Sequence, residues 1–95
     1  MSLTYVLSPM AEADLEDIWA YTAGEWSAEQ AEVYTNSIIN VFEEIAEGRK
    51  KGRSADVREG YLKALVGRHT IYFQVPGDMI AIIRILHQTM DVEQH

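Results

Sequence analysis

The chain has 95 residues, of which 47% are hydrophobic and 24% are charged, which is typical of one globular domain and excludes disordered and low-complexity classes. It contains no cysteine, which excludes disulfides, a thiolate nucleophile and thiolate metal ligands. Its net charge of −7 disfavours binding to nucleic acid and to anionic membranes. Without a long apolar run or a signal-peptide pattern, we expect a cytoplasmic protein in which residues 1–95 form a single domain.

The charge is distributed unevenly along the chain. Residues 1–48 contain ten carboxylates and no Lys or Arg, whereas residues 49–68 contain seven basic residues. The basic stretch is therefore expected to meet an acidic partner segment. Its first part, Arg49–Lys51 with Arg53, lacks interleaved aromatic residues and follows a predicted helix, which favours a role at the helix C-terminus over a nucleic-acid patch.

The first half of the chain predicts a short strand and two helices. Residues 3–7 alternate in polarity as a strand does, and Ser8–Pro9 is typical of a helix start. We expect this helix to end at Gly24. Ser27 with Gln30 matches a capping box and predicts a second helix, which Gly48 is placed to end. Because the connection is short, the two helices should form an antiparallel hairpin.

Each predicted helix has one apolar stripe. The stripe residues recur at steps of three and four, and they are Ala11, Leu15, Ile18, Trp19 and Thr22 in the first helix and Ala31, Tyr34, Ile38, Phe42 and Ile45 in the second. The carboxylates of the first helix, Asp14 among them, are interpreted as lying largely off its stripe. Trp19 and Trp26 are expected to contribute to the core.

The second half predicts an antiparallel sheet. We interpret residues 49–60 as an exposed connection, and expect three strands at 61–66, 69–75 and 79–86. Gly67–Arg68 suits a two-residue turn, and Pro76–Asp78 suits a longer one. The N-terminal strand should join an edge of this meander, with the helical hairpin over one face. The order is β-α-α-β-β-β, an α+β fold.

Four segments carry a resemblance to a known family. They are Leu7–Pro9, Ala13–Tyr21, Val57–Tyr61 and Arg84–Asp91, and their order and spacing extend over nearly the whole chain. The sequence resembles the ParE branch of the RelE/ParE toxin superfamily. The resemblance implies the toxin of a type II toxin–antitoxin system, which a ParD-like antitoxin neutralises and which inhibits DNA gyrase by protein contact. The absence of a recognisable catalytic set favours a protein without catalytic residues or a cofactor, and the acidic net charge predicts no direct contact with nucleic acid or membrane.

Candidate contact residues come from position and from the resemblance. Arg58 and Arg68 are exposed by position and are candidates for binding an acidic antitoxin segment together with Arg84, the alternative being a solvated loop and turn. Tyr72 is a further candidate, and the resemblance adds one segment. Met90–Asp91 is the candidate for the toxic contact with the target.

Arg84 has two interpretations. Strict alternation along its strand places it with Ile80, Ile82 and Leu86. There a guanidinium must either reach a carboxylate within the protein or open onto a binding surface.

The alternative function is that of the RelE branch, which cleaves mRNA in the ribosome. His87 and Arg84, with Lys51 or Arg53, would then form the catalytic set, although the net charge opposes docking onto RNA. The competing interpretation of His87, which we favour, is a strand-end side chain that bonds to its own sheet. A third possibility is a degenerate toxin that retains only antitoxin binding. The spacing of His69, His87 and His95 predicts no metal site.

Overall fold

The computed structural model describes residues 3–55 and 59–90 of the chain. The elements, in order, are β1 (Thr4–Leu7), α1 (Pro9–Glu25), α2 (Ala28–Ala46), β2 (Arg53–Ser54), β3 (Leu62–Val66), β4 (His69–Gln74), β5 (Met79–His87) and a 3₁₀ turn at Gln88–Met90. The strands form one five-stranded sheet in the order β1-β5-β4-β3-β2. The pairing of β1 with β5 is parallel, whereas the other pairings are antiparallel. The predicted α+β class and the edge position of β1 are confirmed.

The polar residues at the helix starts act as predicted. Ser8 Oγ accepts a hydrogen bond from the Ala11 N–H at 3.0 Å, and Ser27 Oγ accepts one from the Gln30 N–H at 3.0 Å. These bonds satisfy backbone donors that a first helical turn leaves without partners. Gly48 follows α2 with a φ of +79°, as expected of a helix-ending glycine. The predicted end of α1 at Gly24 is wrong, because the helix continues to Glu25.

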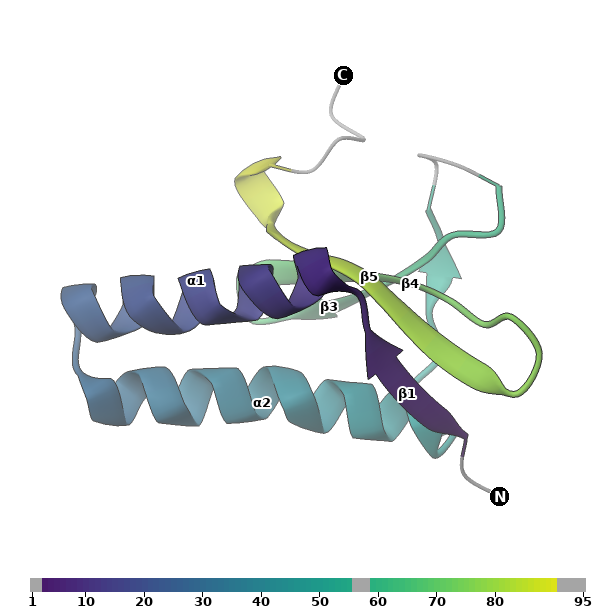
Figure 1. Cartoon of the computed structure of the whole chain (residues 1–95), viewed down its shortest axis with the longest axis horizontal. Helices are drawn as coiled ribbons and strands as arrows, with labels where there is room; N and C mark the ends of the chain where they lie inside the picture. Colours follow the sequence, from purple (N-terminus) through teal and green to yellow (C-terminus); the bar gives the residue numbers. More distant parts are fainter. Residues whose placement is uncertain (1–2, 56–58, 91–95) are drawn as a thin grey trace.

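The core lies between α2 and the sheet face that the helices cover (Figure 1). Its largest fully buried apolar side chains are Ile38, Phe42, Ile71, Phe73, Ile80 and Ile82. Burying side chains of this size supplies about 1.5–3 kcal/mol each. The hairpin end that joins α1 to α2 projects beyond the sheet (Figure 1). The core assignment of Trp26 and Trp19 is therefore wrong, since they are 77% and 38% exposed.

The connection between α2 and β3 contains a strand that the sequence did not predict. Arg53 pairs with Lys63 and Ser54 with Leu62, and two residues are too few to give an alternating pattern. Gly52 precedes this strand and lies against the buried Phe73 ring, where an added Cβ would come within 2.5 Å of Cζ. Glycine is therefore required here for close approach to the core.

Across the described ranges 3–55 and 59–90, neither helix combines the length and apolar character needed to cross a membrane.

Substituting alanine for Gly52 and for Gly24 distinguishes an effect of core packing from an effect of helix propensity. Gly52→Ala should lower the free energy of unfolding by about 1–3 kcal/mol, because the Phe73 ring is buried and cannot easily yield. Gly24→Ala, at a helical position with nothing within 4 Å, should raise it by about 0.5–1 kcal/mol. Urea denaturation of both variants measures the two effects. Equal stabilities would contradict the packing of Gly52 on Phe73.

Candidate functional site

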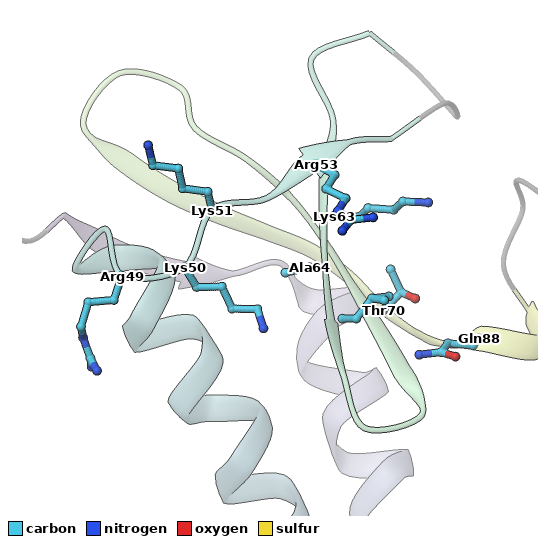
Figure 2. A pocket seen from close by; sticks show the side chains of 9 residues that line it. Arg49, Lys50, Lys51, Arg53, Lys63, Ala64, Thr70 and Gln88 are labelled. Carbon is cyan, nitrogen blue, oxygen red and sulfur yellow. The ribbon is translucent and has the colours of Figure 1, made fainter.

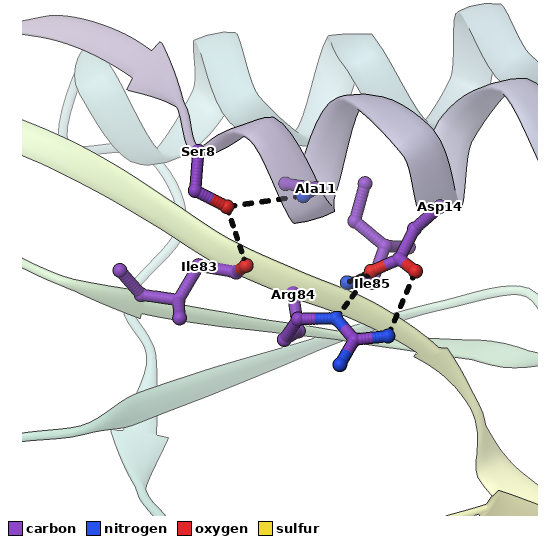
Figure 3. Close-up of polar contacts among 6 residues, drawn as sticks. All are labelled: Ser8, Ala11, Asp14, Ile83, Arg84 and Ile85. Atoms are coloured by element: carbon purple, nitrogen blue, oxygen red, sulfur yellow. Dashed lines mark hydrogen bonds and ion pairs between the residues drawn. The ribbon is translucent and has the colours of Figure 1, made fainter.

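Helix α1 is attached to β5 where β1 ends. The parallel pairing stops at Leu7 opposite Ile82, yet β5 continues to His87. The next residue, Ser8, donates its backbone N–H to the Ile82 carbonyl at 2.9 Å. Its hydroxyl donates to the Ile83 carbonyl at 2.7 Å (Figure 3). One side chain thus caps α1 and continues the hydrogen bonding of the sheet edge.

Asp14 makes the second attachment, six residues after Ser8 and on α1 (Figure 3). Its carboxylate accepts two hydrogen bonds from the Arg84 guanidinium, at 2.8 and 2.9 Å, and one from the Ile85 N–H at 2.9 Å. The Asp14 side chain is 14% exposed and that of Arg84 is 33% exposed. This bidentate geometry is the strong form of an Arg–carboxylate pair.

The ionisation of the pair follows from these contacts. Burial by itself raises the pKa of Asp14, but the hydrogen bonds from Arg84 and Ile85 and the guanidinium charge outweigh it and leave the pKa below its ordinary value of 3.8. The hydrogen bond to Asp14 raises the pKa of Arg84. Both groups therefore stay charged at neutral pH.

The structure shows the internal carboxylate that one of the two interpretations of Arg84 requires, which is Asp14. The predicted alternation is wrong because the β4–β5 register shifts between Tyr72, opposite Arg84, and Phe73, opposite Ile82. Ile83 is the extra residue of this bulge. After it the parity changes, so that Ile85 joins the buried face and Arg84 does not.

Two histidine rings pack edge to face where β4 begins and β5 ends. His69 and His87 are paired in register, with ring centroids 5.2 Å apart in an edge-on arrangement. The Tyr34 hydroxyl lies 2.6 Å from His69 Nδ1. Burial lowers the pKa of His69, and the neighbouring His87 lowers it further, while Asp14 opposes the shift. His69 is therefore held neutral as a packing group.

His87 has local partners of its own. Its Nδ1 lies 2.9 Å from Thr89 Oγ1 and accepts the Thr89 N–H at 3.1 Å. A ring nitrogen that accepts a backbone N–H carries no proton. Among residues 3–55 and 59–90, no group of three His, Cys, Asp or Glu side chains could hold a metal ion.

An apolar groove runs along the outside of the helical hairpin. It has a volume of about 380 Å³ and is lined by β1, α1 and α2 through Leu7, Glu12, Leu15, Glu16, Trp19, Thr35 and Ile39. The Trp19 indole N–H donates to Glu32 at 3.4 Å, which orients the ring. The hairpin therefore presents an apolar floor with an acidic rim.

A second hollow, the cationic cleft, lies around the middle of β3 (Figure 2). It has a volume of about 670 Å³ and is lined by Arg49, Lys50, Lys51, Arg53, Lys63, Ala64, Leu65, Thr70 and Gln88. No carboxylate of the described residues lines it. The structure thus gathers five of the basic side chains around one hollow, on a molecule that is acidic as a whole.

The structure brings some of the predicted contact residues together in pairs. Arg68 is exposed in the β3–β4 turn, and its carbonyl accepts the Gln88 N–H at 2.9 Å, which sets this turn beside the 3₁₀ turn that includes Met90. Tyr72 lies opposite Arg84 but is only 3% exposed. Arg58 and Asp91 lie outside the described residues, as does the side chain of Met90.

Sequence reasoning missed Asp14 and Thr70. Asp14 is three residues after Ala11 and four before Ile18, both buried, so helical periodicity could have identified it as an inward-facing carboxylate. Thr70 is 1% exposed and lines the cationic cleft. No pattern in the sequence distinguishes it from the other residues of β4.

A family model for the ParE toxin of the type II toxin-antitoxin system parDE matches residues 5–92. The chain belongs to this ParE toxin family. Toxin ParE1 of Mycobacterium tuberculosis is 40% identical over 97 residues, which cover 100% of this chain and 99% of the relative. Toxin ParE1 of Caulobacter vibrioides is 39% identical over 92 residues, covering 96% and 95% of the two chains.

A solved structure described as the chromosomal ParDE system from P. aeruginosa has the same fold as this ParE toxin. It superposes with a TM-score of 0.80 at 21% identity, and the match covers 90% of this chain and 96% of the other. The expected resemblance to ParE is confirmed.

The α1–β5 attachment predicts a pH-dependent loss of stability on substitution. Asp14→Asn should lower the free energy of unfolding by about 1–2 kcal/mol at neutral pH, because a charged hydrogen-bonding partner is lost. The folded-state pKa of Asp14 is lowered, so its stabilising contribution is complete above its ordinary pKa of 3.8 and is lost as the pH falls further.

Urea denaturation of both proteins from pH 7 to acid provides the measurement. The difference between wild type and Asp14→Asn should shrink as the pH falls. Asp17→Asn, an exposed change on the same helix, is the matched control and should cost much less at neutral pH. An Asp14→Asn effect no larger than the control, or one independent of pH, would show that the pair contributes little.

Proposed function

We propose that this ParE toxin is neutralised by a ParD-like antitoxin and inhibits DNA gyrase by protein–protein contact. The observation that carries the proposal is the match to ParE toxins along the whole chain, at 40% identity in one relative. A toxin that works by contact needs accessible binding surfaces more than a reactive group. The apolar groove on the hairpin is such a surface.

The groove is suited to an antitoxin segment with apolar side chains on one face and basic residues at its edges. Leu7, Leu15 and Ile39 offer the apolar floor, and the carboxylates of Glu12 and Glu16 lie at the rim. A partner that orders on binding must cover apolar surface to offset its entropy cost. The charge of the rim favours Lys or Arg on the partner.

A second antitoxin contact involves the basic residues of the sequence. Arg68 is exposed and available to an acidic antitoxin segment, and we extend this role to Arg58. Arg84 is paired with Asp14, but one third of its side chain is exposed. This exposed part can contribute at the edge of the same antitoxin contact. Tyr72 is buried and would support Arg84 from the opposite position on β4. Met90–Asp91 remains our candidate for the contact with gyrase, and the 3₁₀ turn that includes Met90 lies next to the Arg68 turn.

The geometry favours contact over RNA cleavage. Arg84 is committed to Asp14, and His87 Nδ1 accepts from the Thr89 backbone. The basic residues proposed to act with them, Lys51 and Arg53, line the cationic cleft, to which neither Arg84 nor His87 contributes. A general acid or base must lie within hydrogen-bond reach of the reacting group that the cations hold.

Gyrase supercoiling in vitro tests the proposed target. The purified toxin should block supercoiling of relaxed plasmid, and adding the cognate antitoxin should restore it. Normal supercoiling at saturating toxin would rule out gyrase as the target. New mRNA ends at the ribosomal A site, abolished by His87→Ala, would support the RelE-type alternative instead. Absence of toxicity on induction without antitoxin would indicate a degenerate toxin.

Substitutions of two tryptophans on the helical hairpin test whether the antitoxin binds in the apolar groove. Trp19→Ala should weaken antitoxin binding by about tenfold, because a large aromatic at the groove is removed. Trp26→Ala removes a more exposed ring outside the groove and should change affinity little. Isothermal titration calorimetry with the purified antitoxin gives both values. Equal losses, or none from Trp19→Ala, would place the antitoxin elsewhere.

A further inference from the structure

The cationic cleft contains a buried hydroxyl that the protein leaves without a partner. Thr70 is 1% exposed, and within the described part of the chain its Oγ1 has no hydrogen-bond partner. In register, Thr70 lies between Leu65 of β3 and Leu86 of β5. A buried polar atom without a partner destabilises the fold, and such atoms are rare in folded proteins. It is therefore a sign that something outside the protein completes the site.

The other groups around this hydroxyl are hydrogen-bond donors. Figure 2 shows Lys63, Thr70 and Gln88 on the same side of β3, with Arg53 above them. Gln88 donates one amide N–H to the Gly67 carbonyl at 3.2 Å, which holds the amide at the cleft. Ammonium, guanidinium, amide and hydroxyl groups together match a ligand that accepts hydrogen bonds and carries negative charge.

The placement of the cations favours a ligand with regularly repeated charges. Figure 2 shows Arg49 and Lys50 alongside α2, on the other side of the β3 ribbon from Lys63. The basic side chains therefore lie on both sides of β3 instead of converging on one point. Leu65, at 54% exposure, adds an apolar contact. Arg, Lys, Thr and Gln side chains are the groups that proteins use to bind the sugar–phosphate backbone of nucleic acids.

We propose that the cationic cleft binds the sugar–phosphate backbone of a nucleic-acid strand, with Thr70, Lys63 and Arg53 holding a phosphate. This departs from our expectation, based on net charge, that the protein makes no direct contact with nucleic acid. The ten carboxylates of residues 1–48 repel a strand elsewhere and confine it to the cleft. Binding is without base sequence preference, and it is salt-sensitive. The proposal goes beyond gyrase inhibition and does not require it.

Fluorescence anisotropy with the full chain and a short labelled single-stranded DNA tests the proposal at low salt. Lys63→Gln and Arg53→Gln should each weaken binding by roughly three- to tenfold and reduce the dependence of log K on log salt by about 0.7. Arg68→Gln removes a charge outside the cleft and should leave affinity within about twofold, as expected of a charge that contacts no phosphate.

Thr70→Val separates a ligand role from a structural role. Because valine has the same shape without the orphaned hydroxyl, the variant should unfold at the same or a higher temperature and yet bind the strand more weakly. An oligonucleotide of the same sequence with uncharged methylphosphonate linkages should not bind. A duplex and inorganic phosphate, used as competitors, distinguish strand from duplex and backbone from free phosphate.

Several outcomes would overturn the proposal. They are equal binding of the methylphosphonate strand, an Arg68→Gln loss as large as that of Lys63→Gln, and unchanged binding by Thr70→Val. Displacement by inorganic phosphate as effective as by the strand would also contradict a backbone site. A polyglutamate peptide that binds more tightly than the strand would indicate an acidic protein as the ligand. Because no gyrase is present, none of these outcomes bears on gyrase inhibition.

Discussion

Strand β5 extends beyond the end of β1, and the hydrogen bonds that its uncovered edge would lack are supplied by Ser8 and Asp14 at the start of α1. Ser8 bonds to Ile82 and Ile83, and Asp14 bonds to the Ile85 N–H and to Arg84. Buried backbone groups must find partners, so these contacts fix the first turns of α1 on the sheet. The direction of α1 in turn positions α2 over the core, and the apolar groove is bounded by the three elements that meet here.

The sequence predicts those features of the fold that depend on neighbouring residues. The caps at Ser8 and Ser27, the helix end at Gly48 and the tight turn at Gly67, whose φ is +54°, each follow from a few adjacent side chains. The pairing of Asp14 with Arg84 joins residues 70 positions apart, and the bulge at Ile83 depends on the register of β4 against β5. Single-residue alternation cannot locate either of them. Strand β2 could not be predicted because its two residues are too few to show the alternation of polarity that is typical of a strand.

The sequence predicts which kinds of residue form the candidate sites better than it predicts where they lie in the fold. The basic stretch after α2 is visible in the sequence, but only the fold brings Arg53 and Lys63 together beside Thr70. Arg84 stands out in an apolar strand, and its pair with Asp14 is a structural reason for it. The molecule consequently separates its charge, with an acidic hairpin that carries the apolar groove and a cationic cleft around the middle of β3. Partners of opposite character can thus bind different surfaces of a small toxin.

The claim that α1 replaces a strand along β5 is tested most directly by hydrogen exchange at one amide. In the wild type, the Ile85 N–H should exchange slowly because the Asp14 carboxylate accepts it. In Asp14→Ala, exchange at Ile85 should become at least about tenfold faster relative to the Ile71 amide in the central strand β4, which reports any general loss of stability. Unchanged protection of Ile85, or the same acceleration at Ile71, would contradict the account.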